Sequence, residues 1–192
     1  MKVFALLLAG ILPALAANPP VAKGQAYGSP SAPILLELYS DFECPACRAF
    51  HTDVFPELMR DFINPGKVYL VEHDLSFHDH SGEATAYAFA AARIGKYPEV
   101  ANALFFHQTE WATSGKIWDA VAGVLSNADQ KRVANLAKDP GVLAEVKVET
   151  DEGRQKIRQT PTMIVIKNMR QYQFVAPNWE LLRAFLNDLL SK

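Results

Sequence analysis

The alternation of apolar and polar residues predicts strands and helices in turn from residue 34 onward. Runs of β-forming residues at 34–39 and 67–72 indicate strands, and between them, from 46 to 62, apolar residues recur every four positions, as on one face of a helix. This order predicts a βαβ unit with a parallel pair of strands. Open α/β sheets place their sites at the carboxyl ends of such strands, here near residue 40.

Residues 80–148 show helical patterns only. We expect Ser81 to cap an alanine-rich helix that ends near Gly95, followed by helices at 98–108, 117–125 and 130–148, the last interrupted at 139–141. The sequence therefore predicts a helical insertion over about 78–150, between strands of one sheet.

The C-terminal part returns to strands. Residues 153–158 are expected to lead into a strand at 163–166, and Asn168-Met169 can turn the chain into an antiparallel strand at 171–175. Asn178 is expected to cap a final helix with a wide apolar face that reaches Leu190. Residues 18–31 are rich in Pro, Gly and Ser, which predicts an extended lead-in over the surface.

Composition limits the function classes. With 192 residues, 49% of them hydrophobic, the chain can bury the core of one domain, which we expect to span 17–192. The formal charge of −2 and the pI near 6.2 give no basic surface for nucleic acid, so no nucleic-acid partner is expected.

The N-terminus has the three parts of a secretory signal peptide over 1–16: Lys2, an apolar run at 3–12, and small residues at Ala14 and Ala16. A membrane anchor is the alternative, but the apolar run is short for a bilayer and Pro13 interrupts it. We therefore expect a cleaved, extracytoplasmic or periplasmic protein, in a compartment where disulfides persist.

The chain has two cysteines, Cys44 and Cys47, at the junction between the first strand and the first helix. Unpaired N–H groups and the positive end of the helix dipole stabilise a thiolate there, so Cys44 is expected to be the more acidic thiol. Pro45 suits the first helical position, and Cys47, one turn inside, is expected to be less exposed and to act as the resolving thiol.

Three other interpretations of this pair are weaker. A coincidental pair does not account for the position between strand and helix, and a structural disulfide across so short a loop adds little stability. A structural zinc site needs four ligands, and no second cysteine pair exists. Redox exchange is therefore the expected chemistry, and it requires no cofactor and no metal.

The histidines are assigned less specific roles. His78 and His80, separated by Asp79, could suggest a metal cluster, but they occupy a polar turn before a helix, and no further ligand follows at helical spacing. His51 is expected to be a helix-surface or packing residue. Trp111 and Trp118 are expected to pack within the insertion, although one could line a peptide groove.

The order of elements and three motifs together resemble the DsbA-like thiol-disulfide oxidoreductases of the thioredoxin superfamily. One motif is the strand that ends in Asp74, followed by His80 and the alanine-rich helix, which resembles the entry to the helical insertion of that family. Residues 40–48 (SDFECPACR) resemble the redox motif of that family, including Pro45 and Ala46, and Thr160-Pro161-Thr162 resembles its cis-proline loop. The resemblance covers about 27–190 and implies an α/β thioredoxin-like fold with a helical insertion. It also implies that Thr160 and Pro161 join the cysteines in the catalytic site, with a cis bond that leaves the Thr160 backbone free to pair with an extended substrate. The residues alone would favour an ordinary trans proline.

The sequence departs from the family pattern at two positions. Leu38 stands where many members carry a buried acid that assists the resolving thiol, and Glu37 beside it is expected to point to the opposite face of the sheet. Either water or another acid such as Glu72 takes that role, or the resolving step is slower. Ala46 stands where a histidine or aromatic residue is common, which predicts a less stabilised thiolate and a less oxidising disulfide.

The resemblance implies an exported enzyme that donates its Cys44–Cys47 disulfide to thiols of secreted proteins and is reoxidised by a membrane quinone-linked oxidase. The opposite direction, that of a reductase or isomerase, stays open. So does a binding module for copper or peptides on the same fold, although no methionine lies near the cysteines in sequence. Isomerases of this superfamily often dimerise through an added N-terminal domain; the short lead-in leaves no room for one, and we expect a monomer.

Overall fold

The computed structural model describes residues 25–192, and the expected signal peptide at 1–16 lies outside this range. Its centre is a mixed sheet with the strand order β1-β3-β2-β4-β5. The strands are β1 (Ala26–Tyr27), β2 (Ile34–Ser40), β3 (Val68–Asp74), β4 (Thr162–Lys167) and β5 (Arg170–Val175). Strands β2 and β3 are parallel, which confirms the expected parallel pair, and β2 and β4 are antiparallel.

The expected single helix at 46–62 is divided into three pieces. They are α1 (Pro45–Asp53), α2 (Phe55–Leu58) and the π-helical turn η1 (Met59–Ile63). The break falls at Val54, two residues before Pro56, because a proline lacks the N–H that would continue the hydrogen-bond ladder and its ring crowds the preceding turn. The buried side chains Phe50, Leu58 and Phe62 still face the sheet, as the four-residue spacing predicted.

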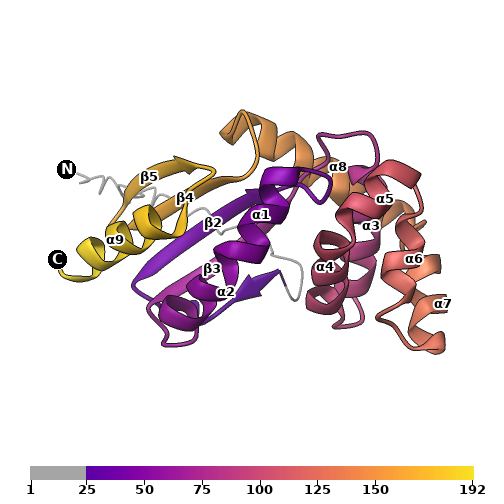
Figure 1. Cartoon of the computed structure of the whole chain (residues 1–192), viewed down its shortest axis with the longest axis horizontal. Helices are drawn as coiled ribbons and strands as arrows, with labels where there is room; N and C mark the ends of the chain where they lie inside the picture. The colour runs from indigo at the N-terminus through magenta and orange to yellow at the C-terminus, as the bar shows by residue number, and fades with distance from the viewer. Residues whose placement is uncertain (1–24) are drawn as a thin grey trace, which may run out of the picture.

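Between β3 and β4 the chain forms helices only; most of them lie together at one side of the sheet, and the last, α8, runs back to the sheet, where it contacts β3 (Figure 1). They are α3 (Ser81–Ala92), α4 (Tyr97–Phe106), α5 (Gln108–Ser114), α6 (Ile117–Ala122), α7 (Asn127–Leu136) and α8 (Pro140–Lys156). Helix α5 was not predicted, and α8 extends beyond the expected end at residue 148. α8 continues through Gly153, where a Cβ would lie 2.5 Å from Leu75 Cδ2, so the glycine permits close packing and does not end the helix.

Three further expectations need correction. Ser81 is the first residue of α3, preceded by His80 at the cap position, and its hydroxyl bonds to the backbone N–H and C=O of His78. The lead-in does not simply cross the surface, since Ala26 and Tyr27 pair with β3 and the side chain of Gln25 is buried. α9 (Trp179–Leu190) is capped by Asn178 as expected, but Leu181 is exposed, so the apolar face of the helix is narrower than predicted.

The interior consists of two main clusters of apolar side chains. One lies between the sheet and the helices α1, α2 and α9, and it includes Leu38 and Met163. The other fills the helical block and extends to Phe42, Cys44 and Cys47. The two cysteines therefore lie where the helical block meets the sheet. Within residues 25–192, no helix has the length and apolar character needed to cross a membrane.

Candidate active site

Cys44 and Cys47 both carry free thiols and lie at the start of α1. Cys44 is the N-cap residue, with extended backbone angles, and Pro45 occupies the first helical turn as expected. Cys44 is 6% exposed and Cys47 is fully buried, while Pro45 and Ala46 between them are exposed. A partner molecule therefore reaches the pair from the side of Cys44.

The two thiols have opposite electrostatic environments. A hydrogen bond from the Cys47 thiol lowers the pKa of Cys44 to about 5, against the effect of burial and together with hydrogen bonds from the Thr160 side chain and from the N–H groups of Cys47 and Ala46. Burial raises the pKa of Cys47, and its interaction with Cys44 raises it further. The difference has the expected direction. The largest contribution comes from the Cys47 thiol, and the N–H groups of the first helical turn, from which the difference was expected, contribute less.

Thr160 and Pro161, which are 116 residues or more away from Cys44 in sequence, lie opposite the cysteines at the start of β4. The Cys44 thiol donates a hydrogen bond of 3.5 Å to the Thr160 carbonyl. The Thr160–Pro161 peptide bond is cis. The Pro161 carbonyl accepts the Ala176 N–H at 2.9 Å, whereas the Thr160 N–H has no acceptor among residues 25–192.

A groove of about 290 Å³ runs beside the cysteine pair. Its lining combines the exposed side of α1 with the loop before β4 and the loop before α9: Ala46, Ala49, Phe50, Asp53, Val54, Pro161, Ala176, Pro177, Asn178 and Trp179. The lining is mostly apolar, with one carboxylate. It suits an extended peptide segment laid across the Cys44 sulfur.

The sequence analysis missed two residues that shape the cysteine loop. The Gln108 side chain, on the unpredicted helix α5, donates to the carbonyls of Phe42 (2.7 Å) and Cys44 (2.9 Å). The Asp41 carboxylate is fully buried and accepts the N–H groups of Glu43 (2.8 Å) and Phe77 (2.7 Å). Asp41 could have been found from its position beside the cysteine motif, but no local pattern indicates Gln108.

A buried polar group lies beneath α1. Glu72 and Asp74 on β3 both accept from the Tyr97 hydroxyl, at 3.1 and 2.6 Å. Burial and the charge of Glu72 raise the pKa of Asp74. His51, one turn beyond Cys47, places its Nε2 3.1 Å from Glu72 Oε1, but the contact lacks hydrogen-bond geometry, and within the described part of the chain neither atom has another partner.

Other candidate residues take structural positions. His51 stacks on Phe105, with ring centroids 3.9 Å apart, as a packing residue. Trp111 is buried in the helical block and Trp118 packs at its edge, as expected. The side chain of Glu37 meets Tyr39 on the face of the sheet opposite to Leu38, also as expected. Among residues 25–192, no three metal-ligating side chains cluster to hold an ion.

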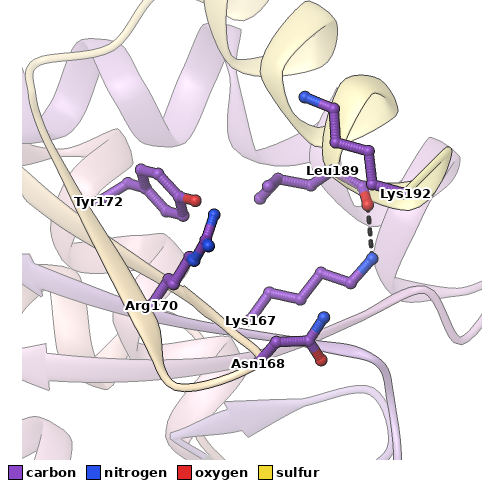
Figure 2. A pocket seen from close by; sticks show the side chains of 6 residues that line it. All are labelled: Lys167, Asn168, Arg170, Tyr172, Leu189 and Lys192. Carbon is purple, nitrogen blue, oxygen red and sulfur yellow. Dashed lines mark hydrogen bonds between the residues drawn. The ribbon is translucent and has the colours of Figure 1, made fainter.

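A second hollow, of about 350 Å³, is lined by Lys167, Asn168, Arg170, Tyr172, Leu189 and Lys192 (Figure 2). It lies between the β4–β5 turn and the end of α9, where the Lys167 amine donates to the Leu189 carbonyl. Since β4 begins beside the cysteines and ends at Lys167, this basic hollow lies at the far end of the strand and shares no residue with the cysteine site.

Comparison with known proteins agrees with this geometry. The family model described as thioredoxin matches residues 21–188. The disulfide bond formation protein D of Bacillus subtilis is 28% identical over 168 residues, which cover 80% of this chain and 74% of that protein.

Two solved structures have the same fold. DsbA of Chlamydia trachomatis matches with a TM-score of 0.75 at 20% identity, covering 95% of this chain and 98% of that one. Oxidised BdbD of Bacillus subtilis matches with a TM-score of 0.73 at 23% identity, covering 88% and 93%. The thioredoxin-like α/β fold is therefore confirmed. The chain belongs to the thioredoxin family, and its paired thiols together with its DsbA-like relatives identify it as a thiol-disulfide oxidoreductase.

Proposed function

We propose that the protein is a disulfide donor that oxidises thiols of other exported proteins. The observation that carries this direction is the unequal pair of thiols, with the pKa of Cys44 lowered to about 5 and that of Cys47 raised. A stabilised Cys44 thiolate favours the reduced enzyme, and a pair whose reduced form is stabilised is a strong oxidant. Ala46 provides no ring or charge to stabilise the Cys44 thiolate, and the hydrogen bonds to the Cys44 sulfur provide this stabilisation instead.

The reaction begins with the oxidised enzyme. A substrate thiolate attacks the Cys44 sulfur, the Cys44–Cys47 bond breaks, and Cys47 leaves as a thiolate that takes up a proton. A second substrate thiolate then attacks the substrate sulfur of the mixed disulfide, and Cys44 leaves as a thiolate. Two electrons pass from the substrate to the enzyme, and the substrate gains one disulfide. Since a leaving thiol of low pKa leaves faster, Cys44 suits the second step.

Substrate binding uses the groove and the free backbone beside it. In this proposal an extended segment lies along Thr160 and Pro161 and accepts a hydrogen bond from the Thr160 N–H, as in the addition of a strand to a sheet. The apolar lining near Phe50 and Trp179 accommodates side chains of varied shape, because apolar contacts impose little geometry. Oxidation of many different proteins requires such tolerance.

The cellular setting is also part of the proposal. The signal peptide at 1–16 is removed on export, and a single domain over 17–192, with its helical insertion at about 78–150, works as a monomer in an extracytoplasmic compartment. The reduced enzyme must give up two electrons after each cycle. A membrane quinone-linked oxidase, expected from the family resemblance, supplies this oxidation.

The test is the redox equilibrium of the Cys44–Cys47 pair in glutathione buffers, read by thiol labelling. A donor is expected to have a reduction potential well above that of the glutathione pool, toward about −120 mV, the value of DsbA. A value near about −270 mV, that of thioredoxin, would instead establish a reductase. Failure to exchange at all would leave only a binding module, and the Cys44→Ser variant provides the baseline without exchange.

A further inference from the structure

The loop that carries Cys44 is bound to the segment just before α3 by two imidazole–carboxylate pairs. His78 Nδ1 lies 3.0 Å from Asp41 Oδ2, and His80 Nδ1 lies 3.0 Å from Glu43 Oε1. The two histidine side chains are similarly exposed, at 42% and 40%. The exchange chemistry described above uses neither pair.

The His78 pair is the one that leads to the reacting sulfur. Its partner Asp41 is fully buried, and its backbone carbonyl accepts the Cys44 N–H at 3.1 Å. The same Asp41 oxygen that meets His78 also accepts the Phe77 N–H. Asp41 thus contacts the imidazole of His78 through its carboxylate and the Cys44 backbone through its carbonyl, so it connects His78 with the turn that holds Cys44.

The charges around His78 favour its protonated form. Burial by itself would lower the pKa of His78, but the hydrogen bond and charge of Asp41, the Cys44 thiolate and Glu43 raise it above its ordinary value. A cation, Arg154 of α8, lies beside the same segment: it is 5.4 Å from the centre of the Phe77 ring and donates to the Ser76 carbonyl. Around His80 the groups are Glu43, Asp79 and Glu83, and Cys44 is not among them.

We propose that His78 is a positioning residue of the exchange site: through Asp41 it orders the turn that holds Cys44, and its positive charge stabilises the Cys44 thiolate. The Cys44 thiolate raises the pKa of His78, and because interaction between two titrating groups is reciprocal, the proposal requires that protonated His78 in turn favours the thiolate, in addition to the hydrogen bonds from Cys47, Thr160 and Ala46 that lower the pKa of Cys44. His78 thus supplies, from another segment, the positive group that is missing at Ala46. The inference rests on the exchange activity and not on its direction.

The first test titrates the Cys44 thiolate by its ultraviolet absorbance in the reduced protein. His78→Gln keeps a donor for Asp41 but removes the charge, and it is expected to raise the midpoint by roughly half a unit to one unit, a threefold to tenfold loss of thiolate below the midpoint. His78→Lys keeps the charge and is expected to restore the wild-type midpoint. His80→Gln removes the similar His80–Glu43 pair, and the midpoint of the Cys44 thiolate titration is expected to stay at the wild-type value.

Equal shifts in His78→Gln and His80→Gln, or no shift in either, would overturn the assignment to His78. A second measurement does not depend on any variant folding. The pKa of the His78 ring, followed by proton NMR, is expected to fall when the wild-type dithiol is oxidised to the disulfide, by the same number of units as the thiolate midpoint shifts. An identical His78 pKa in both redox forms would contradict the proposal even if the enzyme exchanges disulfides normally.

Discussion

Leu38 of β2 and Glu72 of β3 lie side by side, in register on the same face of the sheet. The family resemblance predicts an acid at the position of Leu38; here that position is apolar, and an acid one strand away, Glu72, lies on the same face of the sheet. Glu72 is buried, and its Oε1 atom lies 3.1 Å from His51, one helical turn beyond Cys47. This placement makes Glu72 the candidate for proton transfer to the resolving thiol.

Glu72→Gln is expected to slow the formation of the mixed disulfide, in which the leaving Cys47 thiolate takes up a proton, and the reverse attack of Cys47 on it by about tenfold or more, since a positioned acid or base typically contributes at least that much. The rate is measured by stopped-flow fluorescence or by quenching a preformed mixed disulfide. Glu37→Gln is the matched control, because Glu37 lies on the other face of the sheet. Equal rates in the two variants and the wild type would eliminate Glu72 from this step.

The stability of the reduced protein is expected to depend on pH through Cys44. Its pKa is about 5 in the folded state against 9.0 for the unperturbed thiol, so the stabilisation is complete above pH 9 and disappears as the pH falls through 5. Between pH 7 and pH 5 the loss amounts to at most about 2 kcal/mol, less whatever solvent screening removes. Urea unfolding under reducing conditions measures it. A Cys44→Ser protein with the same slope would assign the loss to other groups.

Gln108→Ala is expected to reduce the free energy of unfolding by about 1–3 kcal/mol, because the carbonyls of Phe42 and Cys44 lose their buried donor. Gln130→Ala is a close control, since Gln130 donates to two carbonyls, of Ala122 and Leu125, within the helical block. Both variants are expected to lose stability, but only Gln108→Ala is expected to change the thiolate midpoint of Cys44. The same midpoint in both would show that the donor serves stability alone.

Ala49→Gln places a longer, uncharged side chain in the groove beside the cysteines. We expect slower oxidation of a reduced protein substrate, by roughly threefold to tenfold, through a higher KM, corresponding to about 1 kcal/mol of lost contact. The equilibrium with glutathione is expected to be unchanged, because so small a thiol does not need the groove. Ala144→Gln makes the same substitution at an exposed position of α8. Slowing of equal size in the two variants would place substrate binding elsewhere.

The parts of the fold that could be predicted are those with local periodic patterns. The β2–β3 pair, the β4–β5 hairpin and the Asn178 cap follow from alternating residues, turn residues and a capping side chain. Helix α5 was missed because its seven residues include one large apolar side chain, Trp111, which is too few to show a period. Strand β1 has only two residues and could not be recognised from alternation.

The residues of the candidate site also fall into two groups: those that a contiguous sequence motif predicts and those whose role depends on distant contacts. Cys44 and Pro45 were found because the motif, the strand before it and the helix after it are contiguous in sequence. The roles of His78 and Gln108 depend on contacts made across 37 and 66 residues, and they arise only when the helical block packs on the cysteine loop. The histidines at 78 and 80 were noticed, but their carboxylate partners could not be assigned from spacing.

The cysteines pack with the helical block, whereas Thr160 and Pro161 lead into a strand of the sheet whose Met163 belongs to the other apolar cluster. The reacting sulfur thus packs in one apolar cluster, and the backbone that would guide its substrate leads into a strand that packs in the other, while α1 contributes side chains to both. A polypeptide bound between Cys44 and the Thr160 backbone would therefore contact elements of both clusters and add a connection between them.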